Sequence, residues 1–204
     1  MDHHLQDVDA GWGTPPADAC EVDLLRRISA RDRDAFTELY VLYHRRLARF
    51  LTRLTRRYDV AEEIINDTML VVWQRAPEFR NASRVSTWIM GIAYRRALNT
   101  LRRASMQTRA DGADDRDSHA SAADAADDVS AIQERHIVQQ GLAQLPLEQR
   151  LVLEFTYYLG HSCEEIATIM DCPVNTVKTR MFHARRKLRD LLPQFGYRLA
   201  GGDS

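Results

Sequence analysis

The sequence is poor in cysteine and has no long apolar run. Cys20, Cys163 and Cys172 are its only cysteines, too few and too scattered for a disulfide framework. No charged start followed by an apolar segment resembles a signal peptide. No uninterrupted apolar stretch approaches the roughly 20 residues that a membrane-spanning helix needs. We therefore expect an intracellular, cytoplasmic protein.

Net charge is nearly absent as well, and so is the alternating pattern of β-strands. The 28 Lys and Arg residues are balanced by 29 Asp and Glu residues, which leaves a formal net charge of −1. An anionic partner must therefore be met by local basic patches. Apolar residues recur at three- and four-residue steps, so the expected fold class is all-α. A chain of 204 residues is long enough for two small helical domains.

The first half of the chain is predicted to form one helical domain, residues 21–104. Its amphipathic helices are expected from Asp34 onward, over 60–76 and over 86–103. The second of these helices ends because Pro77 lacks the N–H that a helix needs. Residues 1–20 mix Gly, Pro and polar residues without a period, and we predict a flexible arm there.

A change of composition separates this domain from a second one. Residues 105–130 are almost only Ala, Asp and Ser, and a segment that cannot bury apolar area cannot offset its ordering entropy. We predict a flexible acidic linker there. Residues 131–195 show helical periodicity again and form the second predicted domain, followed by a flexible tail, 196–204. Its helices are expected over 132–145, over 147–159, after Ser162 and over 172–190.

The last predicted helix concentrates basic residues in a chain of near-zero charge. It follows a short helix that starts with a capping-box arrangement, Ser162 and Glu165, and then a turn. Such a pair of helices is typical of a helix-turn-helix, whose second helix fits the major groove of DNA. The alternative is a solvated, charged helix end. With the apolar stripe packed inward, the side chains expected to face outward are Asn175, Lys178, Thr179, Phe182, His183 and Arg186.

Two charged clusters in the first domain allow both functional and purely structural interpretations. Arginines near the stretch "RNASRVS" and Trp88 can hold a nucleic-acid backbone and an unpaired base. Alternatively, Trp88 anchors the core and the arginines form a solvated face. The acidic cluster 62–67 suggests a site for a basic partner, although such clusters often serve only solubility. The arginines are Arg95, Arg96, Arg102 and Arg103, and the acids are Glu62, Glu63 and Asp67.

Taken together, four segments resemble an extracytoplasmic-function (ECF, group IV) sigma factor of bacterial RNA polymerase. They are "DAFTELYVLYHRRLARFL", "DVAEEIINDTMLVVWQ", "FRNASRVSTWIMGIAYRRALNTLRR" and "LPLEQRLVLEFTYYLGHSCEEIATIMDCPVNTVKTRMFHARRKLRDLL". The resemblance covers about residues 25–192, in the family's order and around the linker. It implies a sigma region 2 domain over 21–104, a sigma region 4 domain over 131–195 and no cofactor.

The resemblance implies contacts with core RNA polymerase and with promoter DNA. Region 2 docks on the clamp helices of the β′ subunit through Glu62, Glu63, Asn66, Asp67 and Gln74. It binds the non-template strand of the −10 element, with one flipped base in its loop, through Phe79, Arg80, Asn81, Ala82, Ser83, Arg84, Trp88, Arg95, Arg96, Asn99, Arg102 and Arg103. Region 4 reads the −35 element through Asn175, Thr176, Lys178, Thr179, Arg180, Phe182, His183, Arg185 and Arg186.

The same resemblance implies further partners, and the sequence differs from the family at two positions of the last helix. Region 4 also seats on the tip of the β flap, the acidic linker threads toward the active-site and RNA-exit channels, and an anti-sigma factor holds many family members inactive. Many members have Gly where Asn175 stands and Ser where Thr179 stands. The base preference of the family is therefore not carried over to this chain.

Three other classes of protein compete with this interpretation. A stand-alone helix-turn-helix regulator would bind DNA without polymerase and would give the acids at 62–67 no function. A zinc or thiol sensor built from His161, Cys163, Cys172 and His183 lacks the close C-x-x-C pairing of common zinc sites. An enzyme would carry a phosphate-binding Gly loop, a nucleophile elbow or paired metal ligands, and no such motif occurs. We therefore expect no bound metal and no catalysis by the chain itself.

Overall fold

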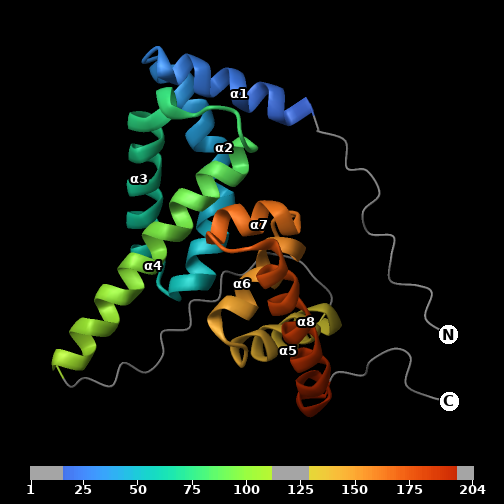
Figure 1. Ribbon diagram of the computed structural model, residues 1–204. Helices are drawn as coiled ribbons and strands as arrows, with labels where there is room; N and C mark the ends of the chain where they lie inside the picture. The colour runs from blue at the N-terminus through green and yellow to red at the C-terminus, as the bar shows by residue number, and fades with distance from the viewer. Residues whose placement is uncertain (1–15, 112–128, 197–204) are drawn as a thin grey trace.

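The computed structural model describes residues 16–111 and 129–196, which form two bundles of helices (Figure 1). No strand occurs in these two ranges, in agreement with the predicted all-α class. Most of the predicted arm, linker and tail, residues 1–15, 112–128 and 197–204, lie outside the described residues. None of the described helices is long and apolar enough to cross a membrane.

The first bundle forms around a long second helix. Asp32 caps the start of this helix, since its side chain accepts hydrogen bonds from the backbone N–H groups of Asp34 and Ala35 at 2.9 and 3.1 Å. Arg56 ends it in the left-handed region, with φ 58°. The elements of this bundle are α1 (Pro16–Ser29), α2 (Arg33–Thr55), α3 (Tyr58–Arg75), the 3-10 helix η1 (Ala76–Glu78) and α4 (Val85–Asp111).

The second bundle contains the predicted helix-turn-helix. The capping box is confirmed: Ser162 Oγ accepts from the Glu165 backbone N–H at 3.2 Å, and a Glu165 carboxylate oxygen accepts from the Ser162 backbone N–H at 2.8 Å. Asp171 closes the short helix in the left-handed region, with φ 52°. The elements are α5 (Val129–Ala143), α6 (Leu147–Tyr157), α7 (Cys163–Met170), α8 (Val174–Leu191) and the 3-10 helix η2 (Leu192–Phe195).

Two predicted boundaries are wrong. The predicted arm, 1–20, overlaps α1, which begins at Pro16 and buries Asp18. The predicted linker, 105–130, is helical at both ends, because α4 continues to Asp111 and α5 already begins at Val129. The end of α4 is rich in Ala, Met, Gln and Arg, which favour helix, so local propensity prolongs the helix beyond the part that packs into a core.

The two bundles pack against each other, chiefly through α4 and α7 (Figure 1). Phe155 of α6 is fully buried, with its ring centroid 5.0 Å from Phe50 of α2 and 6.2 Å from Tyr94 of α4. The guanidinium of Arg53 lies 4.1 Å from the ring centroid of Tyr158, a cation–π contact between the bundles. We call this contact surface, which includes these five residues, the interdomain seam.

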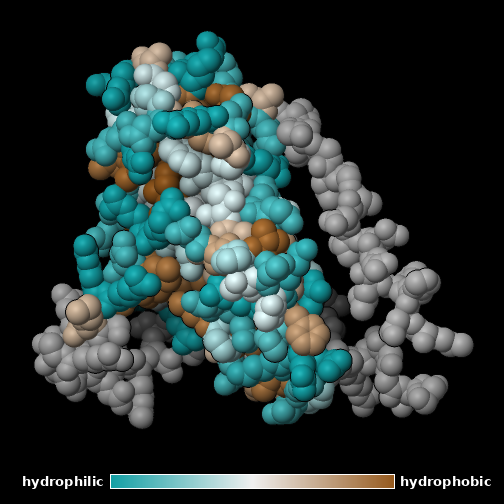
Figure 2. Space-filling view, viewed as in Figure 1, coloured by the Kyte–Doolittle hydropathy of each residue, from teal (hydrophilic) through white to brown (hydrophobic). Residues whose placement is uncertain are grey.

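The outer surface is mainly polar. In the space-filling view, hydrophilic residues cover most of the visible face and hydrophobic residues form small, separate patches (Figure 2). Large aliphatic side chains of both bundles, among them Leu39 and Ile65 in the first and Leu151 and Ile166 in the second, are instead fully buried. Candidates for function on this surface are therefore the charged and polar groups, together with the few aromatic side chains that remain accessible.

Candidate nucleic-acid interface

Helix α8 presents its basic face to solvent. All six side chains predicted to face outward are exposed, and Phe182 is 62% exposed although it is aromatic. The opposite face is buried through Val177, Met181 and Ala184. The capped helix α7 and the left-handed turn at Asp171 hold α8 in this orientation. This is the arrangement of a recognition helix that can enter the major groove.

Some residues predicted to contact the −35 element have partners within the chain. Arg180 is only partly exposed, because it forms an ion pair with Glu148 of α6 and donates to Cys172 Sγ at 3.5 Å. The Arg185 guanidinium lies 5.6 Å from the ring centroid of Tyr157, and Thr176 is half-buried. These contacts fix α8 on its own bundle, while Lys178 and Arg186 are exposed toward an incoming phosphate.

The loop between η1 and α4 projects from two packed aromatic rings. Phe79 and Trp88 are both half-buried, and their ring centroids are 5.2 Å apart at an interplanar angle of 49°. Arg80, Asn81 and Ala82 between them are exposed, and Asn81 adopts a left-handed conformation with φ 57°. Part of the Trp88 side chain remains accessible, as base stacking requires.

Helix α4 follows this loop and presents several arginines on its surface. Arg95, Asn99, Arg102 and Arg103 are exposed along it. Arg96 differs because its Nη1 lies 2.8 Å from Asp67 of α3, an ion pair in which both side chains are about half exposed. Such exposed pairs contribute roughly 0–1 kcal/mol, so the pair does not exclude Arg96 from binding DNA.

The acids predicted to dock on polymerase are not equally available. His44 Nε2 lies 3.2 Å from a Glu62 carboxylate oxygen, and the Tyr40 hydroxyl donates to the Asn66 side-chain oxygen at 3.1 Å. Asp67 binds Arg96, as described above. Glu63 and Gln74 are exposed. Among these acids, Glu63 is therefore the one most open to a partner.

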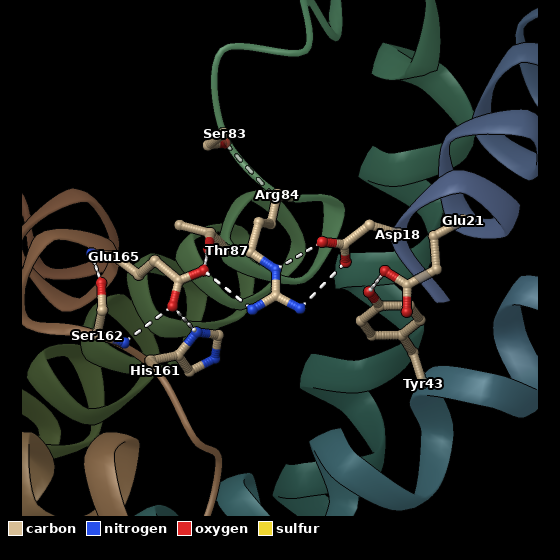
Figure 3. A network of polar contacts seen from close by, with 9 residues as sticks. All are labelled: Asp18, Glu21, Tyr43, Ser83, Arg84, Thr87, His161, Ser162 and Glu165. Carbon is tan, nitrogen blue, oxygen red and sulfur yellow. Dashed lines mark hydrogen bonds and ion pairs between the residues drawn. The ribbon is translucent and has the colours of Figure 1, made fainter. Parts of the chain in front are cut away.

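A cluster of polar residues joins the loop to the second bundle (Figure 3). Arg84 donates to both carboxylate oxygens of Asp18 in α1, at 2.9 and 3.2 Å. Its other nitrogen lies 3.6 Å from Glu165 of α7, and the Thr87 hydroxyl donates to the same carboxylate oxygen at 3.1 Å. His161 Nδ1 lies 3.5 Å from the second Glu165 oxygen. One carboxylate thus contacts both bundles.

The Glu165 carboxylate is charged at physiological pH. Burial favours its neutral form, but the hydrogen bonds from His161, the Ser162 backbone and Thr87 outweigh burial and lower the pKa of Glu165 to about 2. Because this value lies below the ordinary 4.5, the carboxylate stabilises the folded arrangement fully above pH 4.5, and this contribution is lost as the pH falls toward about 2. The hydrogen bond to Asp18 correspondingly raises the pKa of Arg84.

The sequence predicts a binding role for Arg84 but gives no such indication for the other members of this cluster. Asp18 lies within the predicted arm, Thr87 belongs to no motif in the sequence, and the local pattern around Glu165 indicates only a helix cap. The spacing of these residues along the chain contains no signal that they meet, because Thr87 and Glu165 are separated by 78 positions.

The residues considered for a zinc or thiol sensor are in different surroundings. His161 is buried, with its ring centroid 6.0 Å from that of Phe155, whereas His183 is exposed on α8. Cys172 accepts a hydrogen bond from Arg180. Within residues 16–111 and 129–196, no group of three or more His, Cys, Asp or Glu side chains is placed to hold a metal ion.

Both bundles match known protein families. Residues 39–106 match the model of Sigma-70 region 2, and residues 135–188 match the model of Sigma-70, region 4. The ECF RNA polymerase sigma factor SigM of Mycobacterium tuberculosis is 31% identical over 172 residues, which is 84% of each chain. The ECF RNA polymerase sigma factor SigK of Mycobacterium bovis is 32% identical over 184 residues, covering 87% of this chain and 97% of that protein.

Solved structures share the fold. The sigma factor RpoE in complex with the anti-sigma factor NepR from Bartonella quintana has a TM-score of 0.65 at 23% identity, covering 78% of this chain and 96% of that one. CnrH in complex with the cytosolic domain of CnrY has a TM-score of 0.64 at 19% identity, covering 86% and 98%.

The fold and the exposed helix α8 define a two-domain, all-helical protein of the helix-turn-helix class. Within that class, the chain belongs to the ECF sigma factors of the sigma-70 family. It is therefore a transcription initiation factor and not a stand-alone regulator. We refer below to the first bundle as region 2 and to the second as region 4.

Proposed function

We propose that the chain binds core RNA polymerase and directs it to promoters by placing region 2 on the −10 element and region 4 on the −35 element. One observation carries this proposal: the chain presents an exposed recognition helix on one bundle and an aromatic-based loop leading into a basic helix on the other. In this proposal, catalysis belongs to the polymerase, and the chain acts in the cytoplasm, where polymerase and promoters meet.

Region 4 is proposed to bind the −35 element through the solvent face of α8. Lys178 and Arg186 donate to phosphates, while Asn175 and Thr179 face the base edges in the major groove. Phe182 packs its exposed ring against a thymine methyl group or a sugar. Arg180 has a positioning role in this scheme, because its ion pair with Glu148 holds α8 against α6.

Region 2 is proposed to capture one unstacked base of the −10 element in the loop 79–84. Unstacking a base costs a few kcal/mol, so a preformed pocket favours promoters that supply the right base. The Phe79–Trp88 pair provides the preformed aromatic surface, and the arginines of α4 follow the backbone of the same strand. Glu63, with its neighbours on α3, is the proposed contact to the polymerase clamp helices.

An anti-sigma factor is a further proposed partner, since RpoE was solved in complex with the anti-sigma factor NepR.

Run-off transcription with core polymerase over a promoter library tests the proposed function. We expect the chain to select templates that share one −10 and one −35 sequence. Lys178→Ala should weaken −35-dependent occupancy and lower the salt slope of promoter binding by about one unit, since one phosphate contact is lost.

Arg189→Ala is the matched control for Lys178→Ala. Arg189 lies on the same helix and is 68% exposed, but it lies beyond the proposed reading positions. We expect its salt slope to equal that of the unaltered chain. Equal slopes for both variants, or no transcript from any template, would contradict the assignment of α8.

Glu63→Lys is expected to weaken binding to core polymerase by roughly tenfold or more, because a like charge replaces an attractive one at a basic surface. Titration of labelled core polymerase measures this affinity, and thermal unfolding checks that the exposed substitution leaves the fold intact. Glu38→Lys is the control, since Glu38 is exposed on α2 and is not a predicted docking residue. If both variants bind core equally well, Glu63 is not at the docking surface.

A further inference from the structure

The carboxylate of Glu165 divides its two oxygens between regions 2 and 4 (Figure 3). One oxygen faces region 4, where it accepts from the Ser162 backbone N–H at 2.8 Å and lies 3.5 Å from His161 Nδ1. The other faces region 2, where it accepts from the Thr87 hydroxyl at 3.1 Å and lies 3.6 Å from Arg84. Region 2 thus holds an anionic oxygen that belongs to region 4.

Arg84 and Thr87 form a suitable site for such an oxygen without any help from region 4. Asp18, also in region 2, orients the Arg84 guanidinium through two hydrogen bonds. Thr87 lies in the first turn of α4, where the helix dipole favours negative charge. A phosphate oxygen accepts from a guanidinium and a hydroxyl as a carboxylate oxygen does, with the same sign of charge.

This site is partly covered when regions 2 and 4 pack against each other as in the structure, an arrangement that we call closed. Thr87 is only 1% exposed, because α7 lies against α4 (Figure 1). The solvent face of α8 is open at the same time. The contact between α7 and α4 therefore covers Thr87 and part of Arg84, whereas the loop residues 80–82 and the proposed −35 surface remain accessible.

The seam around this site includes charged groups that opening would return to water. Glu154 of α6 is buried and Arg150 is largely buried; the charge of Arg53 on α2 acts on Glu154, and that of Arg56, just after α2, acts on Arg150. Within the described residues, Arg150 Nε and one Glu154 oxygen have no hydrogen-bond partner. Hydration of these atoms on opening offsets part of the cost of separating the two regions.

We propose that Arg84 and Thr87 form a phosphate-binding site for the non-template strand of the −10 element, and that Glu165 occupies this site in the free chain as an internal phosphate mimic. The proposal deepens the proposed function and rests on it, because it assigns the site to promoter DNA. Strand binding requires region 4 to leave. The apparent affinity for single-stranded DNA is then the intrinsic affinity scaled by the fraction of open chains.

Glu165→Gln in the full-length chain tests this proposal. Gln is also accepted at this position of a capping box, so α7 is expected to keep its cap, while the charge that holds Arg84 is lost. The probe is a fluorescent 12-nucleotide oligo(dT) at low salt, because phosphate contacts do not depend on sequence. We expect Glu165→Gln to bind this probe about fivefold or more tightly than the unaltered chain.

Glu164→Gln is the matched control, since it removes the same charge from an adjacent, exposed position of α7. We expect it to bind like the unaltered chain. A third variant, Glu165→Gln with Thr87→Val, should lose the gain because the phosphate loses its hydroxyl donor. Equal affinity of Glu165→Gln and Glu164→Gln, or a gain that survives Thr87→Val, would overturn the proposal.

Run-off transcription distinguishes a failure of this proposal from a failure of the proposed function. At saturating chain, Glu165→Gln should give the same amount of run-off transcript as the unaltered chain, but it should reach half of that amount at a several-fold lower concentration. Absence of any transcript would refute the proposed function. The oligo(dT) measurement shows independently of transcription whether Glu165 occupies the phosphate site of Arg84 and Thr87. If Glu165→Gln and the unaltered chain reach half of the transcript at the same concentration and bind the probe equally, the role of Glu165 as a phosphate mimic is refuted while the proposed function stands.

Discussion

Replacing Trp88 by alanine is expected to lower run-off transcription about tenfold or more while leaving binding to core polymerase in place. Stacking of one base on an aromatic side chain contributes roughly 1–3 kcal/mol, which corresponds to about 5- to 150-fold in an equilibrium constant. Trp88 also packs on Phe79, so its truncation removes support from the loop that presents Asn81. The substitution should therefore impair promoter melting and leave assembly with core polymerase unchanged.

Two comparisons show whether Trp88 contacts a base or only anchors the core. Trp73 is also half-buried and packs on one aromatic ring, that of Phe36, at 5.2 Å, but it belongs to α3 and not to the loop or to α4. Trp73→Ala is expected to lower thermal stability about as much as Trp88→Ala without the same loss of melting. Trp88→Phe keeps an aromatic face and should retain most of the activity. Equal transcription by Trp88→Ala and Trp73→Ala would show that Trp88 is a core anchor.

Replacing Arg150 by Met together with Glu154 by Leu is expected to stabilise the protein by about 1–4 kcal/mol. The side chains of this pair are 13% and 6% exposed, and Arg150 Nε lies 3.8 Å from the nearer Glu154 oxygen, too far for a hydrogen bond. Burial raises the pKa of Glu154 and lowers the pKa of Arg150, so the site disfavours both charges. Apolar side chains of similar volume avoid this desolvation cost.

The single variant Glu154→Leu is expected to have the opposite sign. It leaves Arg150 buried without its counter-charge, which costs about 3–5 kcal/mol. Denaturant unfolding monitored by circular dichroism measures all variants. The exposed pair of Arg26 and Asp23, at 2.8 Å with side chains 78% and 51% exposed, is the control, and its removal should change stability by less than about 1 kcal/mol. A destabilised double variant would show that the buried pair contributes net stability.

Elements that depend on nearby residues were predictable from the sequence. The Ser162–Glu165 capping box, the inward stripe of α8 and its six exposed residues follow from neighbours within a few positions, and the structure confirms them. The order of the helices and the all-α class follow from hydrophobic periodicity in the same way. The predicted boundaries differ from the observed ones in segments with weak patterns, namely the start of α1, the extension of α4 to Asp111 and the start of α5 at Val129.

Only the tertiary structure decided which charged groups already form ion pairs or hydrogen bonds within the chain. The pattern of acids on α3 did not show that Asp67 binds Arg96 while Glu63 stays exposed. Nor did it show that Glu165 reaches from region 4 to Arg84 and Thr87 in region 2. Periodicity assigns a residue to a face of its own helix, but the partner of that face is set by the packing of helices far apart in the chain. The sequence alone thus determined the helices and their outward surfaces, whereas the closed arrangement at the interdomain seam was decided by packing between the two regions.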